Sequence, residues 1–134
     1  MTLIELSKKN PHMWKKIAAL LDFFVTNGMD DRFTRAEREY IFAQVSNKNG
    51  CDFCYIHHYD FSYKLGYANT IDIAAIDDEP GIENIFWITN TANLMNNMVE
   101  YYNITAINEQ NSNLADTIIK KYGYDYKGNF RKTL

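Results

Sequence analysis

Apolar residues recur at helical spacing along most of the chain. The first such run follows Asn10 and Pro11, a pair typical of a helix start, because Asn can cap a helix and Pro fits its first turn. Its apolar positions are Met13, Ile17, Leu20, Leu21, Phe24 and Val25. The segment `TNG` at 26–28 follows, so we expect a helix over roughly 11–25.

Two further helices are predicted on either side of a short break. Thr34 and Glu37 have the spacing of a capping box, which predicts the start of a second helix that ends at `NKNG`, residues 47–50. The third helix begins at Cys51, directly after the glycine, and Gly66 lies close to its end. These two helices are therefore neighbours along the chain, joined by a short turn.

The remainder predicts three more helical segments. A short one covers Thr70–Ile76 before the break `DDEPG`; the longest carries apolar positions from Ile82 to Tyr102; the last is capped by Ser112 and ended by Gly123. The stretch `ITAIN`, 104–108, could form a strand, but a single strand has no partner. We therefore predict an all-α fold: one domain over residues 1–134, a bundle of about six helices.

The long fifth helix is apolar on several sides. Ile85, Phe86, Trp87 and Ile88 are consecutive, so no single face can bury all four. Such a helix is either central to the fold or part of a subunit interface. We favour the interface, and hence a homo-oligomer.

Composition narrows the class of partner. The 134 residues carry a net charge of −3 with no basic cluster, which argues against nucleic acid. The apolar run from Ile17 to Val25 is interrupted by Asp22 and is too short to cross a bilayer. The N-terminus also lacks the residue order of a signal peptide. We expect a cytoplasmic protein that does not act at a membrane.

The chemistry of the sequence is concentrated at the start of the third helix. Cys51, Cys54 and His58 follow an i, i+3, i+7 pattern, so all three can face one cleft. Unpaired amides and the positive end of the helix dipole favour a thiolate there. In the preceding helix, Glu39 is placed to face His58, orient its ring and relay a proton. These residues predict a reactive dithiol.

Other interpretations of the cysteine pair remain open. The two thiols could be small buried hydrophobes, or zinc ligands together with His57 or His58, although no second ligand pair exists. A c-type haem is excluded because Tyr55 follows the second cysteine, and a thioredoxin fold would need a strand before it. We leave His57 out of the site.

Glu37 has a sufficient explanation as the capping partner, and a role as a second acid near the thiols stays open.

The pattern Glu39-x11-Cys51-x2-Cys54-x3-His58, followed by Gly66, resembles the signature of the alkylhydroperoxidase D-like branch of the carboxymuconolactone decarboxylase family. The likeness extends loosely from Pro11 to Gly66 and to the later segment `ANLMNNMVEYYNI`. Phe53 departs from it, since some members carry a His at that position.

This resemblance implies a helical fold that assembles as trimers or hexamers. It further implies an antioxidant, peroxiredoxin-type activity on small hydroperoxides, in which Cys54 attacks and Cys51 resolves. Glu39 and His58 would form the proton relay, and a thiol or lipoyl-type protein would supply electrons. No cofactor and no metal are expected. Within the same chemistry, the protein could instead be a disulfide reductase for a separate peroxidase; a non-catalytic module with structural or zinc-binding cysteines is the alternative from another class.

Overall fold

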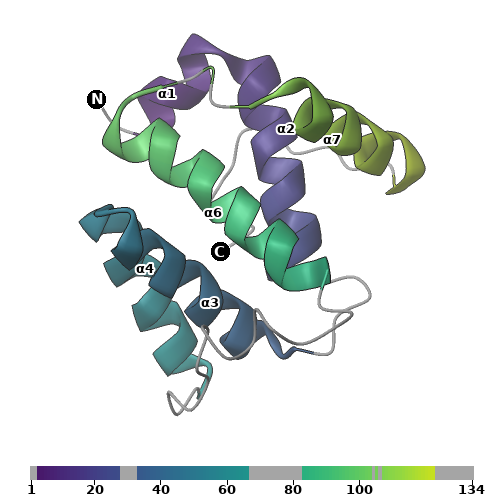
Figure 1. Cartoon of the computed structure of the whole chain (residues 1–134). Helices are drawn as coiled ribbons and strands as arrows, with labels where there is room; N and C mark the ends of the chain where they lie inside the picture. Colours follow the sequence, from purple (N-terminus) through teal and green to yellow (C-terminus); the bar gives the residue numbers. More distant parts are fainter. Residues whose placement is uncertain (1–2, 28–32, 67–82, 104, 106, 123–134) are drawn as a thin grey trace.

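Figure 1 shows a computed structural model of the chain, which describes residues 3–27, 33–66, 83–103, 105 and 107–122. Within these residues the backbone forms six α-helices and one π-helical turn, and no strand. The elements are α1 (Leu3–Lys9), α2 (Pro11–Leu21), η1 (Asp22–Thr26), α3 (Arg35–Lys48), α4 (Asp52–Lys64), α6 (Glu83–Glu100) and α7 (Glu109–Tyr122). The all-α prediction is confirmed for the described part of the chain.

Two helices begin where the sequence predicts them. Asn10 Oδ1 accepts a hydrogen bond from Met13 N at 3.1 Å, and Pro11 is the first residue of α2. Thr34 and Glu37 form the full capping box at the start of α3. Each cap satisfies backbone N–H groups that have no partner within the first helical turn, which is why these boundaries can be predicted from sequence.

A buried arginine joins the end of the first long helix to the start of α3. Arg38 Nε donates to Val25 O at 2.6 Å, and its two terminal nitrogens donate to Phe33 O at 2.5 Å and Thr26 O at 3.2 Å. Val25 and Thr26 end the π-helical turn η1, and Phe33 precedes α3. The planar guanidinium can bond to several such carbonyls at once. Arg38 therefore ties the beginning of α3 to the end of η1.

Helix α6 crosses the centre of the subunit, between the α3–α4 pair and the α2–α7 pair (Figure 1). It contacts α2, η1, α3 and α4. Its core residues are Ile88, Ala92, Leu94, Met95 and Met98. Trp87 stacks on Phe24 with 5.3 Å between ring centroids, whereas Phe86 is 59% exposed. The helix is therefore central within the described part of the chain, and the favoured role in a subunit interface stays a prediction.

The N-terminal helix and the last helix boundary differ from the sequence prediction. Helix α1 was not anticipated, although Leu6 is buried in it. The prediction that Ser112 caps the last helix is wrong. The cap lies four residues earlier, where Asn108 Oδ1 accepts a hydrogen bond from Asn111 N at 2.8 Å and α7 begins at Glu109. Ser112 Oγ instead accepts from Lys16 Nζ at 2.6 Å, which links α7 to α2.

The origin of the error is local. The stretch `NEQNS` holds several residues that can cap a helix, and propensity alone does not choose among them. The predicted segment Thr70–Ile76, the break `DDEPG` and Gly123 lie outside the described residues. None of the described helices has the length and apolar character needed to cross a bilayer.

Candidate functional site

Helices α3 and α4 form an antiparallel hairpin around a tight turn. Gly50 has a φ of +74°, a left-handed conformation that glycine adopts without the steric cost of a side chain. At the turn, Cys51 N donates to Ser46 O at 3.0 Å. At the open end, Ser62 Oγ donates to Ala36 O at 2.7 Å. The start of α4 therefore lies beside the end of α3, and its later turns lie beside the beginning of α3.

The hairpin brings Glu39 of α3 and His58 of α4 together. Glu39 Oε2 lies 2.6 Å from His58 Nδ1, and the two residues are 0% and 3% exposed. Glu39 Oε1 lies 3.7 Å from Arg35 Nε, and the Arg35 guanidinium sits 4.4 Å from the centre of the Phe61 ring. The contact that the sequence predicts between Glu39 and His58 is thus present. A short bond in a buried place is the strong kind of hydrogen bond.

This contact bears on which imidazole nitrogen can act as a base. An ionised carboxylate can only accept hydrogen bonds, so in the tautomer whose Nδ1 donates to Glu39, Nε2 of a neutral ring is the nitrogen that can take up a proton. The Phe42 ring packs against His58 with 3.8 Å between centroids. Residues of α3 therefore contact both Nδ1 and the ring of the imidazole.

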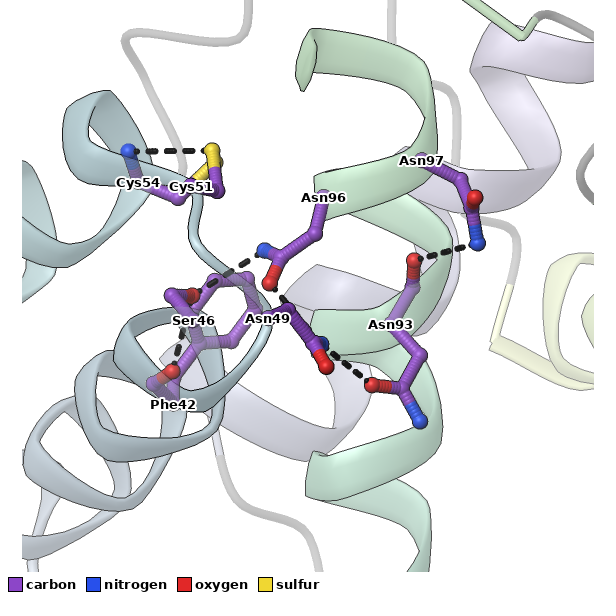
Figure 2. Close-up of a disulfide and its surroundings, with 8 residues drawn as sticks. All are labelled: Phe42, Ser46, Asn49, Cys51, Cys54, Asn93, Asn96 and Asn97. Carbon is purple, nitrogen blue, oxygen red and sulfur yellow. Dashed lines mark hydrogen bonds between the residues drawn. A yellow bond between two sulfur atoms is a disulfide. The ribbon is translucent and has the colours of Figure 1, made fainter. Parts of the chain in front are cut away.

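Cys51 and Cys54 form a disulfide at the start of α4, with an S–S distance of 2.16 Å and a Cα–Cα distance of 5.3 Å. Both are buried: Cys51 is 0% exposed and Cys54 4%. Cys51 is the N-cap residue of α4, and its sulfur accepts a hydrogen bond from Cys54 N at 3.4 Å (Figure 2). The helix-start amide, which favours a thiolate, is therefore directed at Cys51.

His57 lies on the outer face of α4, away from Glu39. Its ring is exposed and stacks on Phe53, with 5.8 Å between centroids and 7° between planes. Partial burial lowers the pKa of His57 below its ordinary value, and repulsion from His58 lowers it further, against the attraction of Glu39 and Asp60. The His57 ring also meets the His58 ring edge-on, with 5.6 Å between centroids, and takes no part in the Glu39–His58 hydrogen bond.

Glu37 is engaged at the start of α3. Its Oε1 accepts hydrogen bonds from Thr34 N at 3.1 Å and Thr34 Oγ1 at 3.0 Å. Because the hairpin is antiparallel, this end of α3 lies beside the later turns of α4 and not beside the cysteines. The capping role accounts for Glu37 without a part in the chemistry.

The zinc alternative finds little support in the side-chain arrangement. In the part of the chain that the structure describes, no three His, Cys, Asp or Glu side chains are grouped so that they could hold a metal ion. The two sulfurs are bonded to each other, and His58 is bound to Glu39. These three side chains therefore already have partners in the structure.

Two residues of the site were missed from sequence. Arg35 precedes Glu39 by one helical turn, and Phe42 follows it by three residues. Helical spacing from Glu39 would have placed both on the same side of α3. Nothing in the sequence, however, indicates that an aromatic ring at that position packs on an imidazole of the next helix.

No family model matches this chain, and no curated protein and no solved structure is significantly similar to it. A functional assignment must therefore come from the chemistry of the site.

Proposed function

We propose that this protein is a thiol-dependent peroxidase of the alkylhydroperoxidase D type, within the carboxymuconolactone decarboxylase family. The observation that carries the proposal is the buried Glu39–His58 hydrogen bond of 2.6 Å, one helical turn from the Cys51–Cys54 disulfide. A dithiol peroxidase needs a base near the attacking sulfur and a second sulfur within bonding distance. In support of the proposal, His58 follows Cys54 by one turn of α4, Cys51 is bonded to Cys54, and Glu39 of α3 bonds to the imidazole.

In the proposed reaction, Cys54 attacks a hydroperoxide in the dithiol form of the protein. His58 takes the thiol proton at Nε2, the Cys54 sulfur bonds to the terminal oxygen, and the O–O bond breaks. The proton returns to the leaving alkoxide, which departs as an alcohol. Cys51 then attacks the Cys54 sulfenic acid, a disulfide forms and water leaves. One peroxide is reduced for each pair of thiols oxidised.

The disulfide returns to the dithiol through an external thiol. We propose that the external thiol attacks the Cys54 sulfur, since Cys51 is completely buried. The Cys51 sulfur then leaves as a thiolate, and the Cys54 amide already donates to that sulfur. A stabilised leaving thiolate speeds this exchange. A second thiol of the reductant, a thiol or lipoyl-type protein, releases Cys54 and closes its own disulfide.

The slight exposure of Cys54 supports a small peroxide as the oxidant, because little of the sulfur is open to a bulky molecule. We further propose that the protein is cytoplasmic, where thiols regenerate the dithiol, and that it is a homo-oligomer, a trimer or hexamer. The exposed Phe86 of α6 supports a contribution of that helix to a subunit interface.

A disulfide reductase that serves a separate peroxidase is the second candidate. Phe53 and Ile56, on either side of Cys54 in α4, are 55% and 64% exposed. Exposed apolar side chains beside a reactive sulfur fit contact with a protein partner. The two candidates share one dithiol cycle and differ in the molecule that oxidises it.

The decisive experiment counts thiols in the reduced protein. One equivalent of tert-butyl hydroperoxide should remove two thiols from the wild type and release one alcohol. Cys54→Ser should abolish this reaction, and Cys51→Ser should stop at a sulfenic acid that dimedone traps. Oxidation of the dithiol by a peroxidase disulfide, but not by the hydroperoxide, would favour the reductase. Turnover of peroxide by Cys54→Ser at the wild-type rate would overturn the assignment of the attacking sulfur.

A further inference from the structure

A buried side-chain network joins the redox hairpin to α6. Asn96 of α6 donates from Nδ2 to Ser46 Oγ at 3.0 Å, and Ser46 Oγ donates to Phe42 O at 2.9 Å (Figure 2). Asn96 is 2% exposed and Ser46 is 0% exposed. Neither residue belongs to the Glu39–His58 pair or to the disulfide.

The turn before Cys51 is held by the same network. Asn49 Nδ2 donates to Asn93 Oδ1 at 2.6 Å and to Asn96 Oδ1 at 3.1 Å. Asn96 therefore uses both ends of its amide, one on α3 and one on the turn. An amide with both ends bonded fixes position better than an apolar side chain, since a shift of α3 along α6 would leave buried polar groups without partners.

Ser46 and Phe42 connect this network to the reacting groups. The backbone carbonyl of Ser46 accepts the hydrogen bond from Cys51 N at 3.0 Å, and the Phe42 ring packs on His58. A side chain of α6 thus acts on Cys51 through one residue of α3. Figure 2 shows the Asn96 amide between the Ser46 hydroxyl and Asn49 of the turn, with the disulfide drawn nearby.

We propose that Asn96 is a positioning residue, which holds Cys51 within bonding distance of Cys54 and thereby favours the disulfide over the dithiol. The inference rests on the reversible dithiol cycle of the proposed function. The tendency of two thiols to close depends on how often they meet, which is their effective concentration. If α6 no longer holds the turn, Cys51 samples more positions and the dithiol becomes relatively more stable.

The test is thiol–disulfide equilibrium in glutathione buffers, where the protein dithiol and one glutathione disulfide give the protein disulfide and two glutathiones. We expect Asn96→Ala to lower this equilibrium constant about tenfold, which is about 30 mV for a two-electron couple. Asn97→Ala is the matched control, because Asn97 is the next residue of α6 and its side-chain amide donates to Asn93 O of the same helix. Its constant should equal that of the wild type.

Stability measurements separate positioning from a general loss of structure. Urea unfolding of Asn96→Ala should show a larger loss in the disulfide form than in the dithiol form, and the difference must equal the change in redox equilibrium. Equal losses in both forms, with an unchanged glutathione constant, would overturn the proposal and leave the proposed function intact. A wild-type protein that does not exchange with glutathione at all would refute both.

Two more variants keep the test decisive if Asn96→Ala does not fold. Ser46→Ala removes the same hydrogen bond from the other side, so its effect on the equilibrium should not add to that of Asn96→Ala in the double variant. Asn49→Ala, at an exposed position, should lower the constant about twofold to threefold, because it loses only the bonds of the turn. Wild-type constants for both variants would refute the positioning role.

Discussion

The α3–α4 hairpin and the layer formed by α2, α6 and α7 bury side chains of different chemistry. In the hairpin, the buried residues include the polar set Arg38, Glu39, Ser46, His58 and Ser62, and the disulfide. In α2, by contrast, the buried residues are all apolar, and most of them belong to one cluster with residues of α6 and α7. The apolar side of α3 joins the same cluster through Ile41, Phe42 and Val45. The two regions meet along α6, where Asn96 faces the hairpin and Ile88 lies in the cluster.

The two regions therefore differ in how strictly they require particular side chains. The apolar cluster needs the right volume and shape, so similar apolar side chains can exchange there at moderate cost. In the hairpin, each buried polar atom needs a particular partner at a particular distance, because an unpaired one loses its hydration without compensation. We therefore expect substitutions in the hairpin to change reactivity first, and those in the cluster to change stability first.

The largest effect should come from His58→Gln. Without the base, Cys54 loses the group that removes its proton, and the rate of peroxide-driven thiol loss should fall at least about 100-fold. Stopped-flow thiol counting measures this rate. His57→Gln is the matched control one residue away, on the exposed face of α4, and should react like the wild type. Equal rates for the two variants would mean that the buried His58 has no special part in the reaction.

Ile88→Ala should lower the stability of the protein and leave its reactivity toward peroxide unchanged. Ile88 is completely buried in the cluster, so its truncation should lower the free energy of unfolding by about 2–5 kcal/mol. Ile4→Ala, the same truncation at a largely exposed position of α1, should change it by less than about 0.5 kcal/mol. Urea titration gives both values. The folded fraction of Ile88→Ala should keep its reactivity toward peroxide; a parallel loss of reactivity would mean that the cluster also sets the site.

A smaller effect should distinguish the two possible caps of α7. Asn108→Ala removes the side-chain acceptor at the helix start and should cost about 1 kcal/mol. Ser112→Ala should cost less, because it removes a partly exposed bond with Lys16 and leaves the helix start intact. Thermal unfolding of the two variants at one pH provides the comparison. A larger loss of stability for Ser112→Ala than for Asn108→Ala would indicate that Ser112 is the cap.

The smallest effect concerns pH. The pKa of His57 is lowered in the folded protein, so below its ordinary value of 6.5 the unfolded chain holds a proton that the folded chain does not. The stability contributed by neutral His57 is therefore complete above 6.5, falls as the pH drops through that value, and levels off below the folded pKa. His57→Gln should lose less stability than the wild type between about pH 8 and about pH 5. Identical slopes of the unfolding free energy against pH in the two proteins would contradict the lowered pKa of His57.

Local patterns were enough to predict much of the helix framework. Asn10–Pro11, Thr34–Glu37 and Gly50–Cys51 act within one helical turn, so their boundaries are correct. Ser112 failed because several neighbouring residues could cap equally well. Helix α1 was missed because its stability comes from burying Leu6 in contact with other helices, which no local pattern records.

For the site, helical spacing placed Cys51, Cys54 and His58 on one side of a helix, because residues three or four apart share one face. Glu39 was selected by its position in the preceding helix, and its contact with His58 is present, whereas the roles of the four residues stay predictions. The partners of those residues were not predictable in the same way. Phe42 packs on His58 across the hairpin, and Asn96 reaches Ser46 from a helix fifty residues further along the chain. Contacts between distant helices depend on how the helices pack, and one sequence does not state that packing.

The amino-acid sequence by itself determined where α2, α3 and α4 start and which chemical groups share a helical face, because both depend on neighbours within one or two turns. Only the tertiary structure decided that the Glu39 carboxylate meets the His58 ring, that the helix-start amide is directed at Cys51, and that an amide of α6 holds the turn. The physical reason is that buried polar groups must find partners wherever the packing of helices places them, and that packing is settled by the whole core at once.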